Sequence, residues 1–322
     1  MLAVSAAARL LRPRSLPWPR LPPARSLALD RRKSPPGIYG NPSKFRTMLD
    51  FLPAPAGTDP DAIVTSPAAS SIVYDGGSGP GALIHKVEIM APASKNALTP
   101  DMMVELEDAV KRCEKEAPSF LVITGAGGTF CSGANIRMAK EAIMPDDQST
   151  DGGQAMAEHM TFVLNRLRDC STISVAAIDG AAYGGGAELA TACDFRVMSP
   201  GARIKHVQSK MGVTTGWGGG RRLAEIVGRR NALRMLTFGE TVDVDMAVRW
   251  GLCDYVTPED ETAATFIENL IREEFPRTAS PVTRSWKAVV DAKSEREEID
   301  LFTTHWNQPA HRFRFDEAMN KK

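Results

Sequence analysis

A single acidic residue, Glu188, lies two positions after the triple glycine Gly184–Gly186. Apolar residues on both sides favour a strand that passes through the glycines into a helix. The first N–H groups of such a helix have no partner, and the positive end of the helix dipole lies with them. This arrangement suits an anion or a developing oxyanion. Taken alone, the segment is explained more simply as a close-packed helix–strand junction in which Glu188 complements the helix dipole.

Two further glycine-rich segments, Gly125–Gly133 and Gly216–Gly220, accompany the triple glycine. None of the three fits the GxGxxG or GxxxxGK[ST] pattern, so a mononucleotide phosphate loop explains them poorly. The five cysteines form no CxxC pair, and the five histidines show no HExxH or zinc-finger spacing. We therefore expect reduced, mostly buried thiols and no metal site.

The elements that must position these segments alternate between strand and helix. A glycine-rich turn at 76–81 predicts a hairpin between 71–74 and 82–90, and Thr99 followed by Pro100 predicts the start of a helix. Further strands are expected at 120–124, 173–178 and 195–198, and helices at 155–168, 223–227, 231–238, 244–250 and 261–275. Strands early and helices late predict an α/β fold of repeated ββα units with a helical C-terminal region.

The composition of the 322-residue chain is that of a folded protein without a membrane span. Apolar residues make up 43% and charged residues 24%, which allows a sizeable core and excludes wholesale disorder. Basic and acidic residues number 39 each, which argues against a protein that mainly neutralises phosphates. No apolar run reaches the roughly 18 residues that a membrane-spanning helix needs.

The first 67 residues differ from the rest in charge and in proline content. Ten of the 39 basic residues but only two of the 39 acidic ones lie in residues 1–50, and twelve of the 22 prolines lie at or before Pro67. Spaced arginines with no acid before Asp30 are typical of an organellar transit peptide. We expect a leader and linker at 1–67, a domain at 68–322, and a mitochondrial matrix location. The alternatives are a disordered basic tail, an over-extended gene model, or a cytosolic protein.

Three motifs occur in order along the domain: Phe130–Ile136, Asp179–Leu189 and Cys193–Arg196. Together they resemble the crotonase (enoyl-CoA hydratase/isomerase) superfamily over roughly residues 70–315. The resemblance implies a spiral of ββα units, with a C-terminal helical region from about residue 239 that packs across a homotrimer or a homohexamer. It also implies acyl-CoA thioester substrates, so coenzyme A enters as part of the substrate and no separate cofactor is expected.

The same resemblance assigns roles to individual residues. The shared chemistry of the family is an oxyanion hole for a thioester enolate, and its two N–H donors correspond to Ala134 and Gly185, next to Gly184. Glu188 corresponds to the glutamate that family hydratases carry after the triple glycine. Backbone around four consecutive residues is expected to line the adenine pocket of coenzyme A: Phe130, Cys131, Ser132 and Gly133. One departure is Asn135, where the family usually has aspartate.

Two positions distinguish between reactions within the family. Family hydratases carry a second glutamate shortly before the next glycine-rich turn, and Gln208 stands at that place. The chain has no Asp or Glu between Asp194 and Glu225. Because a glutamine cannot shuttle a proton as a carboxylate does, hydration by two carboxylates is not expected. Trp217 stands where the family usually has a small residue, and its indole is expected to reshape the acyl pocket beside Gln208.

Segments 192–198 and 223–228 and the terminal HWNQPA resemble the decarboxylase branch of the family, which acts on ethylmalonyl-CoA and methylmalonyl-CoA. Loss of CO2 needs no base, only a carboxylate turned out of the thioester plane and an oxyanion hole for the enolate. We expect this reaction, with Glu188 orienting the carboxylate or protonating the α-carbon. His206 is a second candidate proton donor that we leave outside the expected site.

Two alternatives remain at this stage. One is an enoyl-CoA hydratase or isomerase of fatty-acid oxidation that uses Glu188 alone. The other is a crotonase-fold protein that binds RNA through its local basic pairs, which are Arg221, Arg222, Arg229 and Arg230. Residues 51–322 carry a net charge of −8, so these arginines are expected to face solvent or to bind the phosphates of coenzyme A, and no nucleic-acid partner is expected.

Overall fold

A computed structural model of the chain describes residues 71–76, 83–137, 150–275 and 280–320. All of them belong to one of the two compact units into which the chain divides, Tyr39–Lys322. The expected leader and linker at 1–67 lie outside the described residues. Within the described part, no helix combines the length and the hydropathy that crossing a membrane requires.

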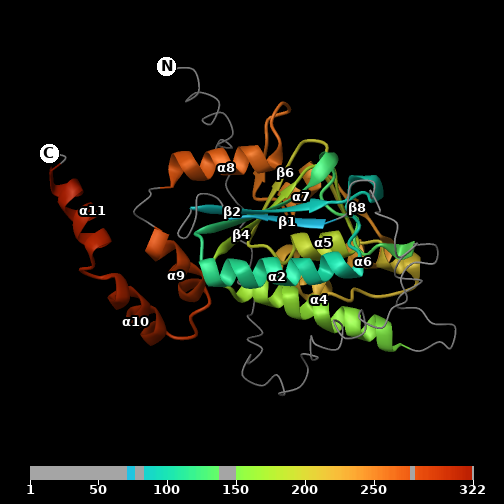
Figure 1. The fold of residues 1–322 in the computed structure, drawn as a ribbon, viewed down its shortest axis with the longest axis horizontal. Helices are drawn as coiled ribbons and strands as arrows, with labels where there is room; N and C mark the ends of the chain where they lie inside the picture. The colour runs from blue at the N-terminus through green and yellow to red at the C-terminus, as the bar shows by residue number, and fades with distance from the viewer. Residues whose placement is uncertain (1–70, 77–82, 138–149, 276–279, 321–322) are drawn as a thin grey trace, which may run out of the picture. The chain divides into compact units, whose positions relative to one another are not determined.

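The centre of the domain is a six-stranded sheet with the order β1-β2-β3-β4-β6-β9 (Figure 1). Strand β1 pairs antiparallel with β2, as the expected hairpin requires, and the remaining neighbours are parallel. The strands are β1 (Ser71–Asp75), β2 (Ile84–Met90), β3 (Phe120–Gly125), β4 (Ile173–Ile178), β6 (Phe195–Met198) and β9 (Tyr255–Val256). The inner strands β3 and β4 are almost continuously apolar because both of their faces are covered.

The domain also contains a second, smaller sheet of three short strands. Its order is β5-β7-β8, formed by β5 (Ala181–Tyr183), β7 (Arg203–Lys205) and β8 (Thr241–Val242). Sequence periodicity did not predict β7 or β8, because two or three residues are too few to show alternation. Strand β5 leads directly into α5 (Gly185–Ala190), as the glycine-rich junction predicted.

Helices cover both faces of the six-stranded sheet (Figure 1). On one face, α2 (Pro100–Glu116) and α4 (Asp151–Asp169) pack against alternate residues of β3, such as Leu121 and Ile123. On the other face, α8 (Ala263–Glu274) packs against the residues between them, such as Phe120 and Val122. Thr99 caps α2 by accepting a hydrogen bond from the N–H of Met102, which confirms the expected helix start.

One predicted helix boundary is wrong and another is confirmed. Helix α4 begins at Asp151, one turn before the expected start at 155. The two helices predicted at 223–227 and 231–238 are confirmed within α6 (Gly219–Phe238), which is interrupted between them at Gly228, where φ is +76°. Helix α7 (Val244–Arg249) follows as expected. The described residues also form three short 3-10 helices: η2 (Pro92–Ser94), η3 (Ala126–Gly128) and η4 (Gln208–Met211).

The last three helices are α9 (Ser280–Val290), α10 (Glu295–His305) and α11 (Pro309–Asn320). Helix α9 is tied to the sheet by Lys287, whose ammonium group lies 2.7 Å from the carboxylate of Asp194. Unlike α7 and α8, these helices leave many large apolar side chains exposed. They are Trp286, Val290, Ile299, Phe302, Trp306, Phe313, Phe315 and Met319.

We predict that Gly186→Ala lowers the free energy of unfolding by about 1–3 kcal/mol or more, the scale of overpacking in a well-packed core. A Cβ atom at Gly186 would lie 2.0 Å from the carbonyl oxygen of Cys131, which belongs to rigid backbone. Gly201→Ala is the matched control, because nothing lies within 4 Å of its Cβ position. Thermal unfolding measures both, and an unchanged melting temperature for Gly186→Ala would contradict the close approach.

Candidate active site

The site is built where the loop at 130–134 crosses the junction between β5 and α5. Cys131 pairs with β5 through two backbone hydrogen bonds: its N–H donates to Ala181, and its carbonyl accepts from Tyr183. A Cβ atom at Gly133 would lie 2.7 Å from the nitrogen of Gly185. The loop and the first turn of α5 therefore touch, and only glycine allows this approach.

The two expected oxyanion donors lie on these touching segments. The neighbours of Ala134 are engaged, because the carbonyl of Gly133 accepts from the N–H of Leu98 and the N–H of Asn135 donates to the carbonyl of Leu98. Among the described residues, the N–H groups of Ala134 and Gly185 donate no hydrogen bond. Both residues are partly accessible. Two uncommitted donors on adjacent backbone segments are what an oxyanion hole requires.

Glu188 is buried, with 2% of its surface exposed, and its carboxylate accepts three hydrogen bonds. The side-chain amide of Gln208 donates to Oε1 at 2.8 Å. The backbone N–H groups of Trp217 and Gly219 donate to Oε2, each at 2.8 Å. Burial raises the pKa of Glu188 above its ordinary value, while these three donors act in the opposite direction. Gly219 must be glycine, since a Cβ atom there would lie 2.4 Å from Cγ of Glu188.

The buried guanidinium group of Arg222 stabilises the main chain around Glu188. Arg222 is 3% exposed and donates to the main-chain carbonyls of Trp217 and Glu188. Burial lowers the pKa of Arg222 to about 10, and its positive charge acts to lower the pKa of Glu188. Because Arg222 points into the protein, it is not part of an exposed basic pair with Arg221. This removes one of the four arginines on which the RNA-binding alternative depended.

Trp217 lies directly over the oxyanion segment. Its indole is 3% exposed, and a Cβ atom at Gly185 would lie 2.3 Å from its Cζ3 atom. The side chain expected to reshape the acyl pocket is therefore in contact with one of the two expected oxyanion donors. Sequence reasoning found Trp217 as a side chain but missed its N–H, and that of Gly219, as partners of Glu188. The signal was the glycine-rich start of α6, where N–H groups are left unpaired.

The residues expected to line the adenine pocket differ in burial and in their hydrogen bonds. Phe130 and Cys131 are fully buried in the core, and both backbone groups of Cys131 are hydrogen-bonded to β5. Burial raises the pKa of the Cys131 thiol to about 12. The Ser132 hydroxyl donates to the carbonyl of Ser94. The expectation that this backbone contacts adenine stays a prediction.

The surroundings of His206 do not favour a role as proton donor. Its ring is fully buried, and among the described residues neither ring nitrogen has a hydrogen-bond partner. Burial lowers the pKa of His206 to about 4, so the ring is neutral near pH 7. No group of three or more potential metal ligands occurs in the described residues, which include all five histidines.

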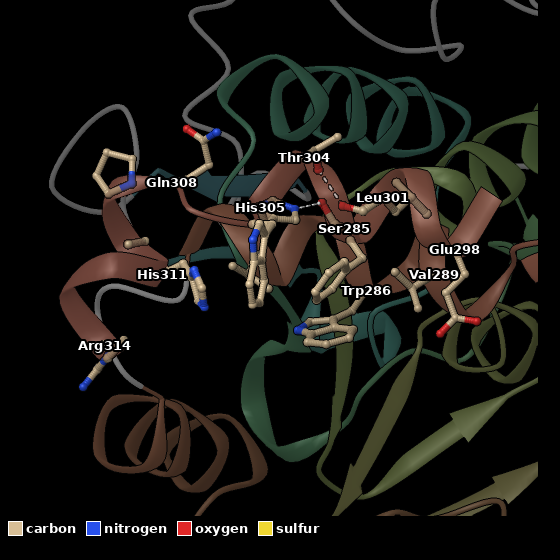
Figure 2. Close-up of a pocket in the computed structure, with 15 residues that line it drawn as sticks. Ser285, Trp286, Val289, Glu298, Leu301, Thr304, His305, Gln308, His311 and Arg314 are labelled. Atoms are coloured by element: carbon tan, nitrogen blue, oxygen red, sulfur yellow. Dashed lines mark hydrogen bonds between the residues drawn. The ribbon is translucent and has the colours of Figure 1, made fainter. Parts of the chain in front are cut away.

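A cavity of about 1010 Å³ lies away from this site, between α9, α10 and α11 (Figure 2). Figure 2 shows Trp286, Val289 and Leu301 on one side of it and His311 and Arg314 on the other. Its walls are mainly apolar and carry no residue of the expected site. The cavity therefore belongs to the exposed apolar surface of the C-terminal helices.

Comparisons with known proteins place the chain in a family. Residues 80–318 match the model of the enoyl-CoA hydratase/isomerase family. Ethylmalonyl-CoA decarboxylase of Gallus gallus is 38% identical over 224 residues, which cover 67% of this chain and 74% of that protein. Ethylmalonyl-CoA decarboxylase of Danio rerio is 39% identical over 230 residues, which cover 68% and 74%.

Solved structures agree with the sequence comparisons. The crystal structure of an enoyl-CoA hydratase/isomerase family member is 27% identical, with a TM-score of 0.66, and the match covers 79% of this chain and 96% of that one. An enoyl-CoA hydratase subunit from Geobacillus kaustophilus is 25% identical, with a TM-score of 0.65, and the match covers 78% and 96%. These matches confirm the predicted crotonase-like α/β fold. The chain thus belongs to the enoyl-CoA hydratase/isomerase family.

Proposed function

We propose that this protein removes CO2 from ethylmalonyl-CoA or methylmalonyl-CoA. The observation that carries the proposal is the pairing of Glu188 with Gln208 at the place where two carboxylates are needed for hydration. No Asp or Glu occurs between Asp194 and Glu225 that could supply the second one. The ethylmalonyl-CoA decarboxylases among the relatives support the same reaction.

The bond that breaks joins the α-carbon to the free carboxylate. Its electron pair moves to the α-carbon and is delocalised onto the thioester oxygen, which becomes an enolate oxyanion as CO2 departs. The N–H groups of Ala134 and Gly185 lie on touching segments and are free to hold that oxyanion. Removing one such donor typically costs about 3 kcal/mol of transition-state stabilisation. The enolate then takes a proton on its α-carbon, and the product is the shorter acyl-CoA.

Glu188 is the group that supplies this proton. Burial raises its pKa, so the protonated form is more accessible near pH 7 than it is for an exposed glutamate. After the transfer, Glu188 recovers a proton from solvent. Trp217 covers the oxyanion segment and limits water there, which disfavours the charged carboxylate of the substrate relative to neutral CO2. Hydration, which uses two carboxylates on one water, lacks its second carboxylate.

The proposal predicts fast CO2 release from ethylmalonyl-CoA or methylmalonyl-CoA and negligible hydration of crotonyl-CoA by the wild-type protein. Gln208→Glu should reduce decarboxylation at least tenfold, because a second carboxylate near Glu188 repels the carboxylate of the substrate. Mass spectrometry of the acyl-CoA products measures both reactions. Rapid hydration by the wild-type protein would favour the hydratase alternative, and unchanged decarboxylation by Gln208→Glu would show that Gln208 lies away from the acyl group.

We also propose that the protein forms a homotrimer or a homohexamer through α9, α10 and α11. The support is the exposed apolar surface of these helices, which includes Trp286, Phe302 and Trp306. Surfaces of this kind mark association sites. The described part of the chain offers no apolar cover for them, since these residues remain about half exposed.

Light scattering should therefore give three or six times the chain mass of 34.9 kDa. Phe302→Ser should shift the population toward monomer, because the exposed ring is replaced by a hydroxyl. Val73→Ser, on the exposed edge strand β1, is the matched control and should leave the assembly unchanged. A monomeric wild-type protein at micromolar concentration would contradict the proposal.

A mitochondrial matrix location is a separate proposal that depends on the N-terminal sequence. Arg9, Arg12 and Arg14 lie in a segment that has no acidic residue before Asp30. Residues 1–40 fused to a fluorescent protein should direct it to mitochondria, and changing these three arginines to glutamine should abolish the import. A diffuse cytosolic signal from the unchanged fusion would overturn this location.

A further inference from the structure

The side-chain amide of Gln208 is held at one end only. Its Nε2 donates to Oε1 of Glu188 at 2.8 Å. Its own Oε1 is buried, and no described residue donates a hydrogen bond to it. Because this oxygen has essentially no accessible surface, neither solvent nor a ligand reaches it in this arrangement. The orientation of the amide is therefore set by a single contact, the one with Glu188.

Another amide in the same domain shows the contrast. Asn96 is fully buried, and its Oδ1 accepts a hydrogen bond from the N–H of Ala91. Its Nδ2 donates to the carbonyls of Ala126 and Thr129. Both ends of Asn96 are fixed by backbone groups, so turning its amide would break every contact. Nothing comparable fixes Gln208.

The two carboxyl oxygens of Glu188 have different kinds of partner. The partner of Oε1 can either donate or accept a hydrogen bond, whereas the partners of Oε2 can only donate. Oε2 faces two backbone N–H groups, of Trp217 and Gly219, and a backbone N–H can only donate. A proton on Oε2 would weaken both of these bonds. Oε1 faces an amide, which has a donor end and an acceptor end of nearly the same shape. A proton on Glu188 is therefore best placed on Oε1.

Turning the Gln208 amide by half a revolution exchanges the places of its nitrogen and oxygen. The carbonyl oxygen of Gln208 would then stand where Nε2 now stands, at hydrogen-bond distance from Oε1 of Glu188. That contact is repulsive while Glu188 is ionised and becomes a hydrogen bond when Oε1 carries a proton. Each protonation state of Glu188 thus has its own matching orientation of the same side chain.

We propose that Gln208 is a positioning residue whose amide turns over when Glu188 takes up a proton, so that one hydrogen bond holds Oε1 in both protonation states. The carboxyl group then keeps its place while a proton is delivered and replaced. A methionine at position 208 could form this hydrogen bond in neither protonation state of Glu188. A carboxylate at position 208 would compete with Glu188 for the same proton. This inference rests on the proposed function only in taking Glu188 as the proton carrier.

The test is infrared difference spectroscopy of the resting wild-type protein, with its glutamine side-chain carbonyls labelled with ¹³C, above and below the Glu188 transition. Protonation should produce a carboxylic C=O band that is absent in Glu188→Gln. The Gln208 carbonyl band, identified by its loss in Gln208→Met, should move to lower wavenumber in the same step because it begins to accept a hydrogen bond. Among the described residues, Arg222 on α6 is the charged group that acts on Glu188. It stays ionised over the pH range in which Glu188 titrates.

The pKa of Glu188 in Gln208→Met gives a second measurement. An amide that stabilises both states leaves this pKa within about one pH unit of the wild-type value when it is removed. An amide that only donates stabilises the ionised form, and its removal raises the pKa by more than that. The inference would be overturned by a Gln208 carbonyl band that does not shift when Glu188 titrates. It would also be overturned if the pKa of Glu188 in Gln208→Met rose by more than about one pH unit. Both measurements use the resting protein without substrate. Their results therefore stand even if the protein fails to release CO2 in the separate activity assay.

Discussion

The burial of one carboxyl group among fixed backbone donors is the constraint on which the rest of this site depends. Glu188 lies in the first turn of α5, yet two of its three hydrogen-bond donors come from Trp217, just before α6, and from Gly219 at its start, about thirty residues later in the chain. Packing α6 against α5 therefore assembles the site and satisfies an otherwise costly buried charge in one step. Arg222 completes the junction by donating to main-chain carbonyls of both segments.

Close backbone approach is the second requirement, and it explains the glycines better than flexibility does. Gly133, Gly186 and Gly219 each lie where a Cβ atom would overlap another part of the site. Two of these contacts bring the loop at 130–134 onto α5, and the third brings α6 onto Glu188. Among the described residues, the N–H groups of Ala134 and Gly185 on these touching segments donate no hydrogen bond. Trp217 then closes over Gly185.

Much of this arrangement could be predicted from the sequence because the relevant signals are local or follow a spaced pattern. The buried strands β3, β4 and β6 and the Thr99 cap follow from composition and periodicity. The family resemblance placed Gln208 near Glu188, and the structure shows a hydrogen bond between the two side chains. The backbone donors of Trp217 and Gly219 could not be found in this way, since every residue but proline has an N–H and only the packing of helices decides which ones meet a carboxylate.

Side-chain burial was also hard to predict at the site itself. Phe130 and Cys131 lie in a motif associated with substrate binding, yet both residues are fully buried in the core. Arg222 belonged to a basic pair in the sequence, and its burial is visible only in the fold. The helices α10 and α11 were not delimited in advance, because their apolar residues do not all face this chain's core.

The most direct test of the account is the turnover number of Glu188→Gln for CO2 release and formation of the shorter acyl-CoA. The substitution keeps the size of the side chain but removes proton transfer, so kcat should fall at least about a hundredfold with little change in affinity for the CoA thioester. Glu225→Gln is the matched control, because Glu225 is an exposed acid whose carboxylate pairs with Arg168 and Arg221. Unaltered turnover in Glu188→Gln would contradict the account and leave Glu188 as a residue that only complements the start of α5.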